Sequence, residues 1–215
     1  MDATERYEAG KAAAAGWCRG ALHSTGPLLR DLKSNHRQIR RRIQLKASIV
    51  LESGDPDRWL LDNQYLIELA VQSARDGLRG AAKLPMLGTD EVQYRLIVLA
   101  GVLTAQPEPF TPEEIVAFLR GIQENTPLQE RELRTLFFAL QYVAIQQLAS
   151  ALPQPKEDRE RSFSNLFARL RQWNDMDFQI VTEQASMVHT AFLGDPTGDY
   201  VKMPPNDRAR YRQRL

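Results

Sequence analysis

Few side chains in this sequence combine the types and the spacing that chemistry requires. Asp175 and Asp177 are the best candidate pair of carboxylates, and such a pair can act as general acid and general base. Both residues also stand where a helix is expected to start. There, a capping side chain and a negative charge near the helix dipole are favourable without any chemistry. We favour the capping role.

A polar pair, Asp62 and Asn63, interrupts an apolar stretch that begins at Trp59. The apolar surroundings predict that Asp62 is buried, and a buried carboxylate without a partner is costly. We therefore expect an arginine from another helix to pair with Asp62, with Arg95 and Arg134 as the candidates. A helix end or a bound ligand is the alternative partner.

Signals for metals, nucleophiles and cofactors are weak. Cys18 is the only cysteine, which excludes an internal disulfide and a thiolate cluster, and we expect it to be a packing residue. The three histidines are scattered, and His189 fits a hydrogen-bonded structural role better than a catalytic one. The sequence also lacks a phosphate-binding glycine loop, a dinucleotide-binding fingerprint and zinc-ligand spacing. We predict no catalytic residue, no metal and no cofactor in this chain.

Charge is balanced overall but uneven along the sequence. The net charge is +1, so the chain as a whole has no field that attracts nucleic acid. Residues 30–46 nevertheless hold seven Lys and Arg side chains and one acid, and residues 202–214 hold five and one. The run Arg40-Arg41-Arg42 could touch nucleic acid or lipid headgroups, but a solvated helix face is the favoured interpretation. Without a nucleic-acid-binding motif, we predict no nucleic acid partner and at most peripheral contact with a membrane.

Apolar residues recur every three to four positions, and alternating strand patterns are nearly absent. This periodicity predicts an all-α fold, a single-domain bundle of roughly eight helices. We expect helices near residues 1–20, 28–50, 56–77, 90–105, 157–172 and 176–192, two more that begin at 112 and 127, and a short basic helix at the end. Residues 84–88 are expected to form a packed loop and residues 153–161 a linker without a domain boundary. The helix that contains Trp59 is apolar on several sides, which predicts a central position.

Two helix starts carry capping signals. Thr111, Pro112 and Glu114 have the spacing of a capping box, and Thr126 with Gln129 repeats the device. We divide the chain into N-terminal amphipathic helices over residues 1–54 and a helical core over residues 55–215, which together form one domain. No apolar run approaches the roughly 18 residues that cross a bilayer, and the first ten residues lack a signal core, so the cytoplasm is the expected compartment.

Three stretches together resemble one family. They are Trp59-Leu60-Leu61-Asp62-Asn63-Gln64-Tyr65-Leu66-Ile67-Glu68 with Leu84-Pro85, then Gln123-Glu124-Asn125-Thr126-Pro127-Leu128 with Glu132-Leu133, and finally Asp195-Pro196-Thr197-Gly198-Asp199-Tyr200 with Met203, Arg208, Tyr211 and Arg212. In this order they resemble the N-terminal helical region of cyclic β-(1,2)-glucan synthases, over about residues 55–215. The third stretch is the most specific. Where the family has an aromatic residue and a histidine after Asp-Asn, this chain has Gln64 and Tyr65, so a role for that histidine does not carry over.

The resemblance implies a piece of a larger enzyme. Members of the family are multidomain bacterial glycosyltransferases of the inner membrane, which polymerise glucose from UDP-glucose, cyclise the chain and trim it with a phosphorylase-like domain. The transferase, phosphorylase and membrane parts are absent from these 215 residues. The implied role is a non-catalytic accessory or scaffolding module at the cytoplasmic side of the inner membrane. Its implied partners are the transferase and membrane domains, and β-glucan.

Seven residues of the matching stretches are the candidate ligand or docking residues: Trp59, Asp62, Asn63, Tyr200, Arg208, Tyr211 and Arg212. Arg and Tyr together can bind a carboxylate, a phosphate or a sugar face, but we favour a structural role in which Arg208 pairs with an acid of the bundle. A stand-alone helical interaction or regulatory protein without a carbohydrate role is the alternative function. A small enzyme that uses Asp62 or Asp175 is a third hypothesis.

Overall fold

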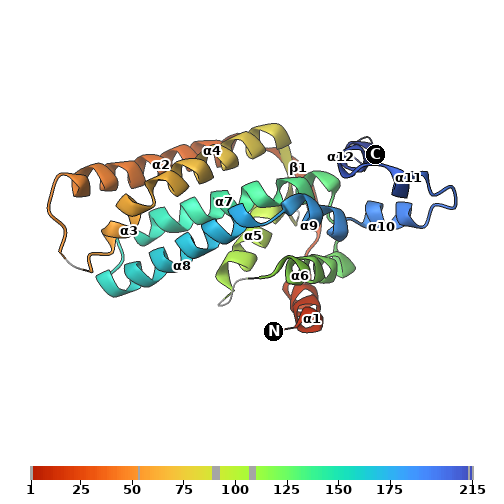
Figure 1. The fold of residues 1–215 in the computed structure, drawn as a ribbon, viewed down its shortest axis with the longest axis horizontal. Helices are drawn as coiled ribbons and strands as arrows, with labels where there is room; N and C mark the ends of the chain where they lie inside the picture. Colours follow the sequence, from red (N-terminus) through yellow and green to blue (C-terminus); the bar gives the residue numbers. More distant parts are fainter. Residues whose placement is uncertain (1, 53, 89–92, 107–109, 213, 215) are drawn as a thin grey trace.

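The computed structural model describes residues 2–52, 54–88, 93–106, 110–212 and 214. Within them the chain forms twelve helices and two strands, so the predicted all-α class is broadly correct and the predicted number of helices is too low (Figure 1). The elements are α1 (Ala3–Ala13), β1 (Arg19–Ser24), α2 (Gly26–Ala47), α3 (Asp57–Asp62), α4 (Gln64–Ala81), β2 (Lys83–Leu87), α5 (Arg95–Ala105), α6 (Pro112–Asn125), α7 (Glu130–Ala151), α8 (Lys156–Asp175), α9 (Phe178–Ala185), α10 (Met187–Leu193), α11 (Asp199–Lys202) and α12 (Pro205–Arg212).

The two strands form a short antiparallel ribbon, in which His23 pairs with Leu84. Residues 84–88, predicted to be a packed loop, are thus mostly strand β2, and the first helix ends at Ala13 rather than near residue 20. The strand signal was hidden for a physical reason. Strand β1 is almost entirely exposed and β2 is buried on both sides at its centre, so neither strand alternates apolar with polar residues.

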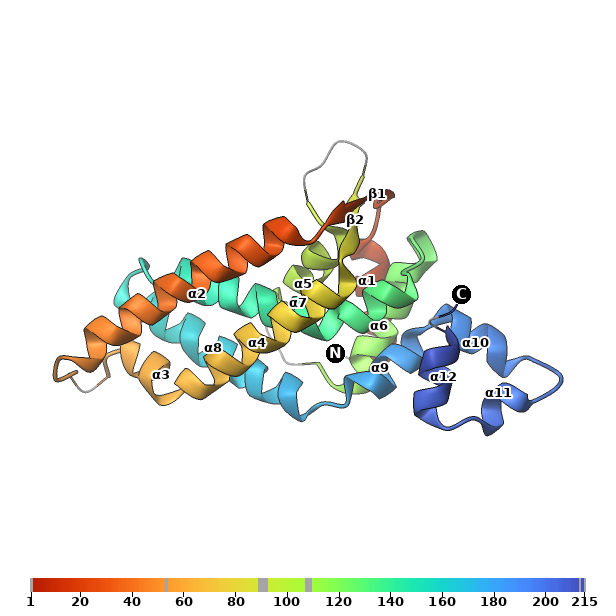
Figure 2. The ribbon, with the colours of Figure 1, turned by 90° about the horizontal axis from the view of Figure 1, so that it is seen from above.

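The long helices α2, α4, α7 and α8 run beside one another and enclose the main apolar core (Figures 1 and 2). Helix α7 is the central element, because it contacts α2, α4, α5, α8 and α9. The predicted central helix is instead two helices, α3 and α4. Helix α4 buries one face only, and Tyr65 on its other side is 75% exposed.

A second contact holds α1 against α6. A Cβ atom at Gly10 would lie 2.1 Å from the carbonyl oxygen of Phe118, and one at Gly121 would lie 2.0 Å from that of Tyr7. Only glycine permits the backbones to approach so closely. Arg6, almost fully buried on α1, strengthens the contact by lying 4.0 Å above the ring of Phe110.

The capping box at Thr111 is confirmed, since Glu114 N donates to Thr111 Oγ1 at 3.3 Å and Thr111 N donates to Glu114 Oε2 at 2.8 Å. The second predicted cap is wrong. Helix α7 begins at Glu130 with Gln129 as its cap, while the hydroxyl of Thr126 accepts a hydrogen bond from Arg95 at 2.5 Å. A buried arginine thus takes the hydroxyl that was expected to cap the helix.

Other boundaries also differ from the expected ones. Helix α5 begins at Arg95 rather than near residue 90, although residues 89–92, like 107–109, lie outside the described part. The expected linker at 153–161 is only a turn over residues 152–155, because α8 begins at Lys156. The expected helix over 176–192 is divided at Ser186, whose side chain caps α10. None of the described helices is long and apolar enough to cross a lipid bilayer.

Candidate functional site

The candidate residues form two groups at opposite ends of the molecule. Trp59, Asp62 and Asn63 lie at α3, and Tyr200 and the residues of α12 lie in an arm built from α10, α11 and α12 (Figure 2). The structure therefore does not assemble all seven residues into one site.

The first group lies beside a fully buried carboxylate, Asp57, at the start of α3. Its two oxygens accept hydrogen bonds from Arg42 of α2 at 3.0 and 2.6 Å, and Lys46 lies 3.0 Å away. Arg159 of α8 lies 3.8 Å away on the third side. Burial alone would raise the pKa of Asp57, but the hydrogen bonds from Arg42 and Lys46 outweigh it and lower the pKa. Asp57 thus fastens α2, α3 and α8 together.

The prediction that Asp62 is buried and paired is wrong. Asp62 ends α3 with its side chain exposed, and the buried carboxylate is Asp57, one and a half turns earlier. The candidate partners are used elsewhere. Arg95 forms a fully buried ion pair with Glu132, and Arg134 donates to the backbone of α7 at 3.3 Å.

A groove of about 400 Å³ opens next to this buried ion-pair cluster. It is lined by Gly54, Asp55, Arg58, Trp59, Asp62, Asn63, Glu160 and Arg171. The ring of Trp59 stacks on Phe167 of α8, with 6.3 Å between centroids and 11° between planes. Asn63 is held on both sides, because its amide donates to Trp59 O at 2.9 Å and its oxygen accepts from Arg171. These contacts give the groove a fixed wall.

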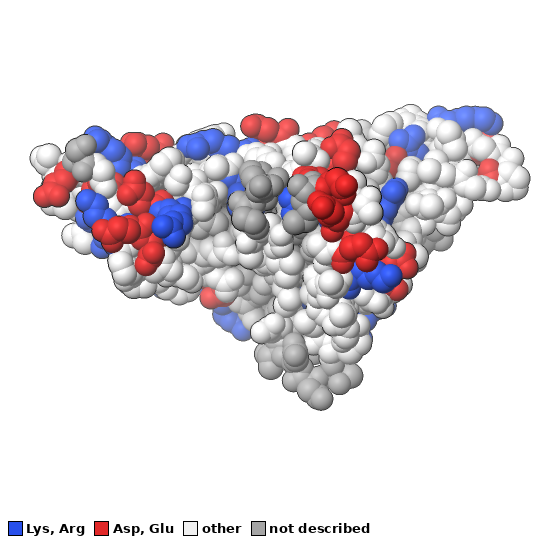
Figure 3. Space-filling view, turned by 90° about the horizontal axis from the view of Figure 1, so that it is seen from below, with Lys and Arg blue, Asp and Glu red and all other residues white. Residues whose placement is uncertain are grey.

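The chemistry of this groove suits a polar ligand with an apolar face. The half-buried indole of Trp59 offers a flat surface, while Asp62 and Glu160 supply acceptors and Arg58 and Arg171 supply donors. A sugar ring needs this combination of a ring face and surrounding hydrogen-bond partners. On the side of the molecule drawn in Figure 3, both signs of charge are interspersed at the end that carries α3 and α8. The lining of the groove likewise holds both signs of charge, three acids and two arginines, so it does not select strongly for charge.

The second group is occupied with holding the arm. Arg208 donates to Glu183 of α9 at 2.8 Å and to Met203 O at 3.0 Å, so it pairs with an acid of the bundle as predicted. Arg212 is almost fully buried and lies 3.3 Å from both Glu183 and Glu130. These cations are fully used by structural contacts.

Tyr200 is also buried in this anchor. Its hydroxyl accepts from Arg212 at 2.6 Å and lies 2.8 Å from Nδ1 of His189. The hydrogen-bonded role predicted for His189 is confirmed, and burial, aided by the cations of α12, lowers its pKa. Among the four candidates of the arm, Tyr211 alone keeps an exposed ring, which packs edge-on against Phe192 at 5.2 Å. This group provides an anchor, and only Tyr211 remains available for a ligand.

The remaining candidates for chemistry were the carboxylates Asp175 and Asp177, Cys18 and a metal site. Asp177 caps α9 by accepting from the backbone of Gln179 and Ile180, as the capping interpretation predicts. The same role expected for Asp175 is wrong, because Asp175 is the last residue of α8 and not at a helix start. Cys18 is exposed, so its expected packing role is wrong. In the described part of the chain, no three His, Cys, Asp or Glu side chains gather in a way that could hold a metal ion.

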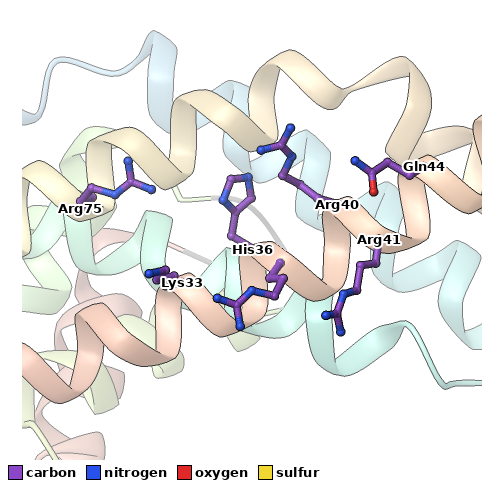
Figure 4. A pocket seen from close by; sticks show the side chains of 7 residues that line it. Lys33, His36, Arg40, Arg41, Gln44 and Arg75 are labelled. Atoms are coloured by element: carbon purple, nitrogen blue, oxygen red, sulfur yellow. The ribbon is translucent and has the colours of Figure 1, made fainter.

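One feature of the molecule was not predicted from the sequence, and a second was predicted only in part, as the basic residues 30–46. Glu183, the hub of the arm, stands in a polar run without any distinctive spacing. The second feature is a cationic groove of about 490 Å³ between α2 and α4 (Figure 4). Its signal was present as Lys33, Arg37 and Arg41, which recur at steps of four.

Comparison with known proteins does not assign this chain to a family. A scan against models of known protein families found no match to this chain. A search of curated proteins found no match either. The resemblance to the glucan synthases therefore stays a prediction that rests on the three stretches of sequence.

Proposed function

We propose that this chain is a non-catalytic helical module of a cyclic β-(1,2)-glucan synthase-like protein, and that it contacts glucan through the groove at α3. The observation that carries the proposal is the placement of the first matching stretch. Trp59 and Asn63 from that stretch are held in one wall of the groove by Phe167 and Arg171 of α8. An indole face that is already fixed loses little conformational entropy when a sugar ring stacks on it.

The arm supports the scaffolding half of the proposal. Its polar contacts face inward to Glu183, while apolar side chains at Met187, Leu193, Val201 and Tyr211 are exposed. Exposed apolar side chains that are concentrated on a firmly anchored projection are typical of a surface that packs against another protein domain. The partner in this proposal is the transferase domain of the synthase.

Calorimetric titration with linear and cyclic β-(1,2)-glucans tests the carbohydrate contact. We expect binding in the millimolar range or tighter, weakened about tenfold or more by Trp59→Ala, because the stacking surface is lost. Tyr65→Ala is the matched control, since this exposed aromatic residue lies on α4 outside the groove. Absence of binding by the unmodified chain at millimolar glucan would leave scaffolding alone as the role.

Two further observations separate the other hypotheses. Turnover of UDP-glucose that is lost in Asp62→Asn would favour the small-enzyme hypothesis. A neighbouring reading frame for a membrane transferase favours a synthase module, and its absence favours the stand-alone interaction protein. The projecting arm suits both of these non-catalytic roles, whereas the groove at Trp59 favours the carbohydrate-linked one.

A further inference from the structure

One row of α2 side chains changes from basic to apolar along the helix. Lys33, Arg37, Arg41 and Leu45 follow one another at steps of four along the exposed side of α2, in a ridge that winds gradually around the helix, and Ile49 continues the spacing just beyond its end. All five are exposed, Leu45 by 60% and Ile49 by 54%, although Ile49 lies just beyond the end of α2 at Ala47. This face, which we call the α2 row, points away from Leu32 and Ile39, which are buried in the core.

Helix α4 adds cations along the basic half of the α2 row. Arg75 lines the cationic groove together with Lys33, His36, Arg37, Arg40, Arg41 and Gln44 (Figure 4). A neighbouring hollow shares Lys33 and Arg75 and adds Arg79. The basic strip is thus two helices wide and follows the helix axes rather than enclosing one small ligand.

Little negative charge offsets this strip. Glu68 of α4 lies 2.9 Å from His36 and 3.9 Å from Arg40. Lys33, Arg37 and Arg41 form no ion pair with any residue in the described part of the chain. Three uncompensated cations in one row produce a local positive potential despite the net charge of +1.

The apolar half of the row identifies the kind of surface that fits. Val50, which follows Ile49, is 98% exposed, so three aliphatic side chains, Leu45, Ile49 and Val50, are exposed at and just beyond the C-terminal end of α2, after the cations. Nucleic acid is bound through cations at its phosphates and aromatic rings that stack on its bases, and exposed aliphatic side chains contribute to neither contact. The α2 row offers no aromatic ring on which bases could stack. An anionic bilayer uses both halves, because its phosphates attract the cations and its acyl boundary accepts aliphatic side chains.

We propose that the α2 row, flanked by Arg75 and Arg79, docks the protein peripherally on an anionic lipid surface. Lys33, Arg37 and Arg41 contact headgroup phosphates, and Leu45, Ile49 and Val50 insert at the level of the first acyl carbons. This site does not depend on the proposed glucan contact, because the groove at Trp59 belongs to different residues.

Co-sedimentation with vesicles tests the site. We expect the purified chain to bind vesicles of phosphatidylglycerol and phosphatidylcholine, and to stay in solution with phosphatidylcholine alone. Arg37→Gln with Arg41→Gln should weaken partitioning about 30-fold, since each cation near the surface contributes about a fivefold factor. Leu45→Ser with Ile49→Ser should weaken it about tenfold or more and leave the salt dependence unchanged.

The matched control removes two exposed cations elsewhere. Lys156→Gln with Arg161→Gln on α8 takes away the same charge and should leave vesicle binding within about twofold. Circular dichroism of each variant checks that the helices remain, and all the altered residues are exposed. A control variant that weakens binding as much as the α2 variant would overturn the proposal, because binding would then follow net charge alone.

Two other ligands separate the alternatives. Inorganic phosphate at millimolar concentration should neither bind measurably nor displace the protein from vesicles, because the strip has no enclosed anion site. The protein should bind a short single-stranded RNA no more tightly than it binds the vesicles. Its affinity for the RNA should be unchanged by Leu45→Ser with Ile49→Ser. Retention of full vesicle affinity in that double variant contradicts the insertion step and with it the proposal, as does the absence of binding to anionic vesicles.

Discussion

Nε of Arg208 donates to the Oε1 atom of Glu183 at 2.8 Å, although the two residues are 25 positions apart in the sequence. The other oxygen of the same carboxylate lies 3.3 Å from Arg212, and His189 lies 3.7 Å from Oε1. A single side chain of α9 thus receives contacts from both α10 and α12. Glu183 is thus the main polar anchor of the arm, and Glu130, 3.3 Å from Arg212, is the second.

Replacement of Glu183 should release the arm. In Glu183→Gln, the buried Arg212 loses part of its charge compensation, and we expect the free energy of unfolding to fall by about 3 kcal/mol. Limited proteolysis should then cut within residues 187–212 before it cuts the rest. Glu157→Gln, on the exposed first turn of α8, is the control and should change stability by less than about 0.5 kcal/mol. An unchanged proteolysis pattern in Glu183→Gln would contradict the prediction, and would show that the pair Arg212–Glu130 and the apolar contacts suffice to hold the arm.

The arm should also respond to pH through His189. Burial lowers the pKa of His189 below 6.5 and, together with the nearby cations Arg212 and Arg208, outweighs the opposite effect of the Glu183 carboxylate. The unfolded state therefore binds more protons, so this contribution to stability is complete above pH 6.5 and is lost as the pH falls towards the folded-state pKa. An NMR titration should give a midpoint below 6.5, and cleavage of the arm should increase in the same range. His189→Gln should remove this part of the pH profile, and its persistence in that variant would contradict the prediction.

Asp57 should dominate the acid sensitivity of the α3 end. Its pKa is lowered in the folded state, so its contribution is present above the unfolded value near 4 and disappears as the pH falls through the folded value. Asp57→Asn should reduce the free energy of unfolding by about 3 kcal/mol at pH 7, because Arg42 and Lys46 lose the buried negative charge that compensates them. Urea unfolding should show this difference between wild type and variant narrowing below about pH 4. A difference that is constant with pH would mean that the loss is steric.

The crossing of α1 and α6 should not tolerate a methyl group. Gly10→Ala and Gly121→Ala each place a carbon within about 2 Å of a carbonyl oxygen on the other helix, so α1 must move away. We expect each to lower the free energy of unfolding by about 2 kcal/mol or more. Gly101→Ala, in the middle of α5 with open space around its Cβ position, should instead raise it by about 0.5–1 kcal/mol. Thermal unfolding followed by circular dichroism measures all three variants.

Much of the helical architecture could be predicted from local patterns. The stripe of α7 and the capping box at Thr111 are properties of neighbouring residues, and the structure has both. The ribbon of β1 with β2 was missed because its pairing joins segments about 60 residues apart and β1 lies almost entirely on the surface. The cap at Thr126 failed for a related reason, since Arg95 takes its hydroxyl from another helix.

The candidate site residues were likewise predicted only as far as local sequence allows, because their partners lie far away in the sequence. The polar pair Asp62-Asn63 marked the correct region, but which carboxylate is buried depends on how α2 and α8 meet α3. An Arg and an acid that are far apart in the sequence give no sign of their pairing, so the hub at Glu183 could not be found. Tyr200 and Arg212 were singled out as ligand contacts, and their burial in the anchor emerges only from the three-dimensional arrangement.

The contact between α1 and α6 also constrains the order of assembly. Arg6 meets Glu114 across 108 positions of sequence, so the first helix leaves the ribosome long before its partner has been synthesised. Strand β1 pairs with β2, and α2 contacts α4, within the first half of the sequence, although both helices also pack on the later α7. We expect the nascent protein to close the ribbon and the α2–α4 pair first, and to seat α1 only after α6 has emerged.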